Sequence, residues 1–550
     1  MKKLFFFIFL FIGINIYSQD FPEKSINIPS QNPKLVVGIV IEQMRQDYLD
    51  KFWNFFSDKG FKKLAINGSY CKNANLNFSL TQTAPGYATI VTGAEPSVHG
   101  IVSDFWYNYL TSKKEIAIVD KSQKNIGESS SPISFSPINL LSTTFSDEAK
   151  IFNSNKSKII SMSLDATGAV LSGGFAANAA FWFDEISGKW ISSSYYCKNL
   201  PKWVIEQNNK KMPDEYLQRF WLPMLASEKL KSYDYDSLVY KMGFDGVYKS
   251  FPYNYSEIRK FIPKYELLKM IPEGNNHLTD LAVAAIYEEN LGKNEITDFL
   301  FINYSVTENI GKLFGPQSAE ILDVFIRLDQ NIAHLIEVLE DVVGKNNILI
   351  YLTSNHGIAE IPQYSIDNKL PSGIYRQHYI IALLKSYLKS IYGEGDWILD
   401  YNNNQIYLNK ILIEDSRISL QEFQEKIISF VINSNGIMNA ISSHQFQNII
   451  FNTGMPQKMQ NSYNQKRSGD IMIALKPGWL EDIAFSTDHN SGYSYDTHVP
   501  LIFYGWKIKK QVILNKINIT DIAPTISNIL NTPPPPLTTG KILNELYINK

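Results

Sequence analysis

The chain of 550 residues contains only two cysteines, Cys71 and Cys197, too few for a disulfide scaffold or a four-cysteine zinc site. It also lacks an excess of either charge, because 52 Lys and Arg residues are balanced by 54 Asp and Glu residues. No basic excess therefore indicates nucleic acid or an anionic membrane surface as a partner. The remaining composition, 44% apolar and 13% aromatic, excludes disorder over most of the length and indicates a globular chain.

The N-terminus carries the pattern of a cleavable signal peptide. Lys2 and Lys3 precede an apolar run over residues 4–14, and small Ser18 follows. The run is short for a membrane span, and no later uninterrupted apolar run reaches about 18 residues. We expect a signal peptide over 1–18, no membrane span after its cleavage, and a periplasmic or secreted mature chain, with a buried N-terminal strand as the alternative. Cys71 and Cys197 could then pair in an oxidising compartment.

Four short apolar runs rich in β-branched and aromatic residues predict strands buried on both faces. A helical pattern of apolar residues over 319–343 separates the second run from the third, which predicts a parallel strand–helix–strand unit. The predicted fold class is α/β, with a central, mostly parallel sheet flanked by helices. Residues 19–550 form this domain, with cap-like insertions at roughly 170–290 and 365–480. The four runs are residues 35–41, 299–304, 348–352 and 500–504.

Polar residues lie at or near the ends of these predicted strands. Ligand sites of open parallel sheets lie beyond the carboxyl ends of the strands, so these polar groups are expected to converge. They are Glu42, residues 305–308, Asn355 with His356, and Asp488 with His489.

Six motifs occur in order along the chain: IEQMR at 41–45, TQTAPGY at 81–87, a segment at 92–102 that ends in HGIV, TSNHG at 353–357, YDTHVP at 495–500 and DIAPT at 521–525. Together they resemble the alkaline phosphatase superfamily. The closest resemblance is to exported monomeric alkaline phosphatases with a threonine nucleophile, which are related to the nucleotide pyrophosphatase/phosphodiesterases. It covers nearly the whole mature chain, in order.

The resemblance implies a small phosphate-ester substrate, a monomer and two zinc ions that bridge the phosphoryl group. It places the nucleophile on Thr83. The ligands of the nucleophile-side metal fall on Glu42, Thr83, Asn355 and His356, and those of the other metal on Glu308, Lys312 and His489.

This chain departs from the family at most of those positions. Glu42 and Glu308 stand for Asp, Asn355 stands for Asp, and Lys312 stands for His. The phosphate-contacting positions also differ: Asp104 falls where the family has Asn, and Asp165 and Thr167 fall where the alkaline phosphatases have Lys and Arg.

Lys312 is the departure with the largest chemical consequence. A protonated ammonium has no lone pair for a metal, and Glu308 lies four residues earlier on a predicted helix, where ion pairing favours the charged lysine. We therefore infer that this second metal is absent and that Lys312 takes the place of its charge, which leaves one divalent metal or none. Asp104 and Asp165 would repel a phosphate dianion where the family supplies donors.

Three hypotheses follow. The first is an exported alkaline-phosphatase-like protein whose two-zinc site is degraded, a pseudoenzyme that is weakly active or inactive as a phosphatase. The second is an active single-metal hydrolase of phosphate or sulfate esters, with Thr83 as nucleophile and Lys312 in the role of the second metal. The third is a non-catalytic binding protein of the cell envelope. Under the first two, Thr83, Asp104 and Lys312 form the catalytic group, and Asp104, Asp165 and Thr167 line the substrate. His356 and His489 could instead be structural histidines of the core.

Overall fold

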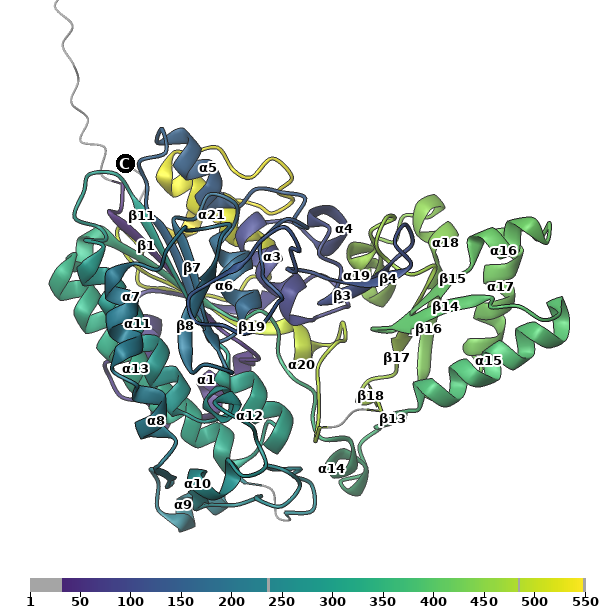
Figure 1. Ribbon diagram of the computed structural model, residues 1–550, viewed down its shortest axis with the longest axis horizontal. Helices are drawn as coiled ribbons and strands as arrows, with labels where there is room; N and C mark the ends of the chain where they lie inside the picture. The colour runs from purple at the N-terminus through teal and green to yellow at the C-terminus, as the bar shows by residue number, and fades with distance from the viewer. Residues whose placement is uncertain (1–31, 235–237, 483–484, 548–550) are drawn as a thin grey trace, which may run out of the picture.

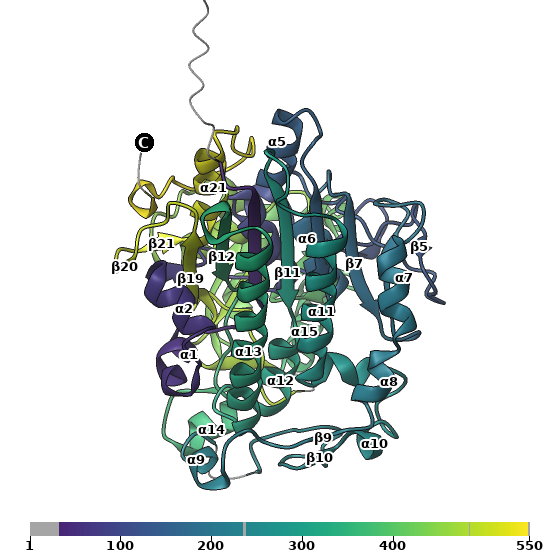
Figure 2. The same ribbon diagram turned by 90° about the vertical axis from the view of Figure 1, so that its left-hand side faces the viewer.

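The computed structural model describes residues 32–547 except 235–237 and 483–484, so the predicted signal peptide lies outside the described residues. An eleven-stranded sheet forms the centre of the body (Figures 1 and 2). Its order is β20 (Gln511–Ile513), β2 (Ser69–Asn75), β19 (His498–Gly505), β12 (Ile348–Thr353), β1 (Leu35–Ile41), β11 (Asp298–Tyr304), β6 (Ile159–Ser163), β7 (Ala179–Asp184), β8 (Lys189–Ser193) and β5 (Asn125–Ile126), with β21 (Ile517–Asn518) beside β2.

The centre of the sheet is parallel, as predicted. β12, β1, β11, β6 and β7 run in one direction, and every residue of β1 is buried. The flanks are antiparallel, because β19 pairs antiparallel with β12 and β8 pairs antiparallel with β7. The prediction of an α/β fold is confirmed, and the sheet is mixed. Since β19 runs in the opposite direction, the loop that precedes it, with Asp488 and His489, reaches the carboxyl edge of the parallel strands.

Helices cover both faces of the sheet, which explains why the central strands are continuously apolar. Val37 and Ile39 pack in one hydrophobic cluster with α11 (Glu273–Glu288) and α13 (Ala319–Val342). Val36 and Val40 pack in a second cluster with α3 (Thr83–Thr92), α6 (Ala166–Gly173) and α21 (Ile522–Leu530). The helix predicted over 319–343 is confirmed as α13, which begins after Ser318, whose side chain accepts the Ile321 N–H at 3.2 Å.

A separate lobe, called the cap here, lies beside the body and comprises residues 373–481 (green in Figure 1). Its antiparallel sheet has its own hydrophobic cluster, with α15 (Gln377–Tyr392) and α17 (Leu420–Val431) packed on it. The strands of that sheet, in spatial order, are β14 (Ile398–Asn402), β15 (Gln405–Leu408), β17 (Ile471–Leu475) and β16 (Ile437–Ser442). Residues 170–290, the other segment for which an insertion was expected, contain β7, β8 and α11, which belong to the body.

Two further expectations concern cysteines and membranes. Cys71 and Cys197 are both free thiols, and Cys71 is buried in β2. Within the described ranges, none of the helices has the length and apolar character needed to cross a membrane.

Gly86 lets the first turn of α3 lie directly against the end of β12. A Cβ atom at this position would lie 2.3 Å from the carbonyl oxygen of Asn355 and 2.7 Å from its Cβ. Thr83 begins the same helical turn, so this close approach sets the position of the threonine hydroxyl relative to the strand end.

We expect Gly86→Ala to lower the free energy of unfolding by about 1–3 kcal/mol, because the added methyl group overpacks a rigid backbone contact. Denaturant unfolding would measure this. The matched control is Gly173→Ala, also in a helix, where the nearest atoms lie 3.4 Å from the new Cβ. This control should change stability by less than about 1 kcal/mol. Equal effects of the two substitutions would contradict the packing argument.

Candidate active site

The carboxyl edge of the parallel strands brings together residues from distant parts of the chain. Glu42 follows β1, Glu308 lies in the first turn of α12 (Val306–Phe314) after β11, and His356 follows β12. Thr83 begins α3, and His489 lies in the loop before β19. All five side chains except that of Thr83 are buried.

The Thr83 hydroxyl points at a carboxylate. Its Oγ1 lies 3.2 Å from Oε2 of Glu308 and 3.5 Å from Nε2 of His356. Thr83 is also the first residue of a ten-residue helix, whose N-terminal N–H groups and dipole stabilise negative charge nearby. The hydroxyl therefore has a proton acceptor on one side and a favourable electrostatic setting for a developing anion.

The two histidines are stacked and oriented alike. Their ring centroids are 3.7 Å apart with planes at 16°. Nδ1 of His356 lies 2.8 Å from the Gly357 carbonyl, and Nδ1 of His489 lies 2.6 Å from the Thr81 carbonyl. A carbonyl only accepts, so each Nδ1 carries the hydrogen. In the neutral ring, each Nε2 then presents its lone pair toward Glu308, at 3.7 and 3.4 Å.

The electrostatics differ between the two rings. Burial lowers the pKa of His356 to about 4, with help from His489. Burial and Lys312 also act to lower the pKa of His489, but Asp488 and Glu308 outweigh them and raise it.

Lys312 forms an ion pair inside the site. Its Nζ lies 2.7 Å from Oε1 of Glu308 and 3.4 Å from Oδ1 of Asp488. Burial acts to lower the pKa of Lys312, but these two carboxylates outweigh it and raise the pKa well above its ordinary value. Burial likewise acts to raise the pKa of Glu308, but Lys312 and the histidines bring it well below the usual range. The lysine is therefore an ammonium without a lone pair, and the glutamate is a carboxylate.

Glu42 and Asn355 are held by their own neighbours. The Tyr87 hydroxyl donates to Glu42 at 2.8 Å, and burial, together with repulsion from Glu308, raises the pKa of Glu42 well above its usual value. The amide oxygen of Asn355 accepts the Gln43 N–H at 3.3 Å, while its Nδ2 is buried without a hydrogen-bond partner. Both side chains therefore lie at the site, each hydrogen-bonded to a neighbour of its own.

One group of side chains fits a divalent metal. Glu308, His356 and His489 each offer a ligand atom, and these atoms lie within 4.8 Å of one another. Nε2 of His489 is buried without a hydrogen-bond partner, which suits a metal ligand. The group combines one member of the expected nucleophile-side set with two of the other. Thr83, also expected as a ligand, borders the group, with its Oγ1 3.2 Å from Glu308 and 3.5 Å from His356. The ligand roles expected for Glu42, Thr83 and Asn355 stay predictions.

A cavity of about 250 Å³ opens beside Thr83. Asp104 lines it and accepts the Ala84 N–H at 2.7 Å, and burial raises its pKa to about 6. Asp165 and Thr167 line it as well. The side chain of Asp165 caps α6 by accepting the Thr167 N–H at 2.9 Å.

Sequence reasoning missed one cation of this cavity. Lys269, from the 3₁₀ helix Glu266–Met270, lines it and forms an ion pair with Glu185 at 2.7 Å. Burial acts to lower the pKa of Lys269, but Asp165 and Glu185 outweigh it and raise the pKa. No motif surrounds this lysine, which lies in the irregular part of the chain, so only its place in the fold identifies it.

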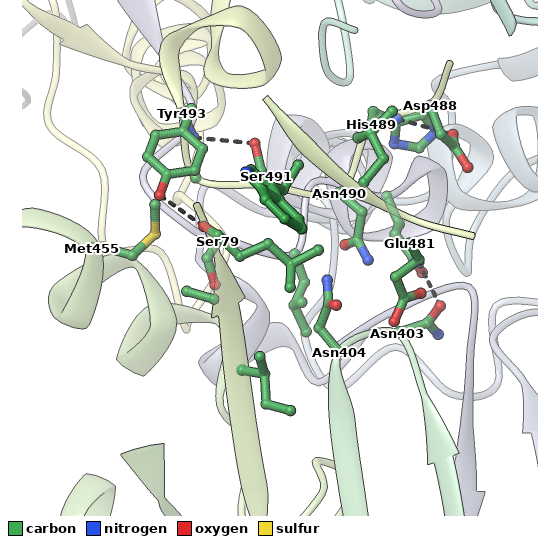
Figure 3. Close-up of a pocket in the computed structure, with 18 of the residues that line it drawn as sticks. Ser79, Asn403, Asn404, Met455, Glu481, Asp488, His489, Asn490, Ser491 and Tyr493 are labelled. Atoms are coloured by element: carbon green, nitrogen blue, oxygen red, sulfur yellow. Dashed lines mark hydrogen bonds and ion pairs between the residues drawn. The ribbon is translucent and has the colours of Figure 1, made fainter. Parts of the chain in front are cut away.

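A second cavity, of about 160 Å³, lies between the body and the cap (Figure 3). Lys312 and His489 line it, and Asp104 lines both cavities. Its cap-side residues, among them Asn403 and Glu481, were also missed from sequence.

Comparison with known proteins decides the family. The model of the type I phosphodiesterase / nucleotide pyrophosphatase family matches residues 36–493. The chain belongs to this family. It is 33% identical to alkaline phosphatase PhoV of Synechococcus elongatus over 518 residues, 94% of this chain and 93% of that one. It is 33% identical to alkaline phosphatase PafA of Elizabethkingia meningoseptica over 529 residues, 95% and 96% of the two chains.

Solved structures agree. The crystal structure of PafA superposes with a TM-score of 0.90 at 32% identity, over 94% of this chain and 99% of that one. Murine ectonucleotide pyrophosphatase / phosphodiesterase 5 superposes with a TM-score of 0.52 at 13% identity, over 93% of this chain and all of that one, and shares the fold alone. The predicted superfamily is confirmed, and the chain is a member of a family of alkaline-phosphatase-like phosphoester hydrolases.

We expect Lys312→Met to lower the free energy of unfolding of chelator-treated protein by about 3–5 kcal/mol, because it leaves the buried Glu308 carboxylate without its strongest partner. Added Zn²⁺ should raise the thermal midpoint of this variant more than that of the parent. Calorimetry with and without metal would measure both effects. The control is Lys51→Met, which breaks the half-exposed pair with Asp47 and should cost about 0–1 kcal/mol. A Lys312→Met variant as stable as the parent would contradict the role assigned to the ion pair.

Proposed function

We propose that this chain is an exported, monomeric one-metal hydrolase of monoanionic phosphate diesters, with Thr83 as nucleophile and little activity on phosphate monoesters. One observation carries the proposal: a single cluster of metal donors converges on the Thr83 hydroxyl, and the Lys312 ammonium lies where a second cation would be needed. Export rests on the predicted signal peptide over 1–18.

The donor chemistry supports a single metal. The group Glu308, His356 and His489 suits Zn²⁺, which prefers imidazole nitrogen and carboxylate oxygen. When bound, the ion would supply Lewis acidity to the threonine oxygen and to the ester.

The ion pair supplies a route for protons. Thr83 gives its proton to Glu308, 3.2 Å away, as Oγ1 attacks phosphorus. The bond from phosphorus to the leaving oxygen breaks, and that oxygen takes a proton from Lys312. One proton then passes from Glu308 to Lys312 across 2.7 Å and restores both groups. Water cleaves the phosphothreonine diester in the second half-reaction, which returns the threonine and releases a monoester.

The charge beside Thr83 favours a monoanion. Asp104, Asp165 and Glu308 border the cavity, while Lys269 supplies the positive charge among its described lining residues. Before any metal is counted, the side chains of this cavity therefore oppose a phosphate monoester dianion more than a monoanion. A diester carries one charge, which Lys269 can balance.

The same acidic cavity favours a second candidate function. A chain that repels phosphate and neutralises its own metal ligands through Lys312 could be a pseudoenzyme that binds a ligand in the cell envelope without turnover.

Metal content tests the one-metal proposal. We expect about one metal ion per purified chain by elemental mass spectrometry. The double variant Lys312→His/Asn355→Asp should hold about two, because it removes the ammonium and restores a carboxylate. The matched control Lys51→His/Asn433→Asp, at exposed positions, should leave the content unchanged. Two zinc ions in the parent would overturn the proposal, and no gain in the double variant would count against the ligand assignment.

Kinetics test the nucleophile and the charge argument. The parent should hydrolyse methyl p-nitrophenyl phosphate with a higher kcat/KM than p-nitrophenyl phosphate. Thr83→Ala should lower the diester rate by about three orders of magnitude. Thr83→Ser should keep part of the rate, and Thr111→Ala, at an exposed position, should match the parent. A parent without turnover in the presence of metal would favour the pseudoenzyme, and an active Thr83→Ala would exclude Thr83 as nucleophile.

A further inference from the structure

The second cavity lies on the leaving-group side of the candidate site. Lys312, which protonates the leaving oxygen in the proposed reaction, lines this cavity and not the one that contains Thr83. Asp104 borders both, so the two cavities meet there. An ester with its phosphorus at Thr83 therefore extends its leaving group between the body and the cap.

The cap supplies an apolar wall. Leu475 ends β17, and Trp479 begins β18 (Trp479–Glu481). Gly373 and Gly436 pack on the Trp479 indole so closely that a Cβ on either would lie 2.7 or 2.3 Å from the ring. The indole is therefore fixed in place before any ligand binds.

Two side-chain amides also line this cavity. Asn404 sits in the two-residue turn between β14 and β15, with a φ of 58°, and is buried. Asn490, with a φ of 105°, has a buried amide oxygen without a hydrogen-bond partner. Figure 3 shows the two amides pointing toward each other. An unpaired buried oxygen is destabilising, so this position suits a ligand that donates a hydrogen bond.

The charges exclude anionic leaving groups. Glu481, Asp488 and Asp104 line the cavity, against one ammonium from Lys312 among its described residues. Glu481 is held by the Tyr401 hydroxyl, so its carboxylate stays beside the cavity. A second phosphate or a carboxylate on the leaving group would be repelled, and a neutral group would not.

We propose that this cavity binds the leaving group of the ester and selects a hydroxyl-bearing ring, a sugar or cyclic polyol, through Asn404 and Asn490. The inference rests on the proposed function and names its substrate class. A sugar ring has a C–H face that can contact Leu475 and Trp479 and a rim of hydroxyl groups that can bond to the amides, so it matches both kinds of lining residue.

The test compares two phosphodiesters that differ in their hydroxyl groups. One is the methyl ester of the phosphate of glucose 6-phosphate, called methyl glucose 6-phosphate here, and the other is methyl cyclohexylmethyl phosphate. In both, the leaving group is a primary alcohol on a six-membered ring. The parent should favour the sugar diester in kcat/KM. Asn404→Gly/Asn490→Gly should reduce that preference by about tenfold, the loss expected from one or two hydrogen bonds. Glycine keeps the positive φ of both positions. The control is Asn155→Gly, an exposed turn residue with a φ of 63°.

A binding measurement separates this inference from the proposed function. Thr83→Ala is titrated with methyl glucose 6-phosphate by calorimetry, with and without the two glycine substitutions. Weaker binding in the triple variant supports recognition of the sugar even where no variant turns over. Equal parent rates for the two diesters, or a faster methyl 2-aminoethyl phosphate, would overturn the inference while leaving the hydrolase proposal standing. Calorimetric binding unchanged by the glycine substitutions would overturn it as well.

Discussion

The buried ion pair between Lys312 and Glu308 is the interaction on which the rest of the site depends. It keeps the Glu308 carboxylate ionised, so that the Thr83 hydroxyl has a proton acceptor and the carboxylate can share a metal ion with the two histidine nitrogens that face it. It also supplies, as an ammonium, the positive charge that a buried carboxylate requires. The same carboxylate belongs to the group of side chains, Glu308, His356 and His489, that could hold a metal ion. The ionised Glu308 also acts on its neighbour Glu42, whose pKa is raised by burial and by repulsion from Glu308 and which accepts a hydrogen bond from Tyr87.

Much of the fold could be predicted from sequence because its determinants are local. A strand covered on both faces must be apolar throughout, and β1, β11, β12 and β19 each carry such a run, as α13 carries a helical one. The direction of a strand in the sheet could not be predicted in this way. The sequence of β19 is as apolar as those of the other strands, but β19 is antiparallel to β12, because the chain enters it from the cap at the opposite end. An apolar run predicts a buried strand but not its direction.

The residues of the site likewise fall into those that the sequence predicts and those that it does not. Thr83 and His356 lie in recognisable motifs and His489 lies in the polar loop before a predicted strand, so their convergence followed from the predicted topology. The grouping of metal donors did not, because it depends on side-chain geometry that mixes two expected sets. Lys269 and Asn404 could not be predicted, since they reach the cavities from segments without periodic pattern and across long stretches of chain. Charge compensation between distant segments, as in Lys269 with Glu185, leaves no mark in a linear motif, whereas the Glu308–Lys312 pair four residues apart on a helix could be predicted.

The hairpin turn of the cap has one further consequence. Asn403 accepts the side-chain amide N–H of Gln82 at 2.7 Å and donates to the Phe105 carbonyl at 3.1 Å, and Gln82 in turn accepts the backbone N–H of Asp104 at 2.9 Å. The tip of the inserted lobe is thus bonded to the immediate neighbours of Thr83 and Asp104. Such a lobe cannot be exchanged between relatives as an independent module. Over evolutionary time, changes in this turn of the lobe and changes in the backbone beside Thr83 have to stay compatible with each other.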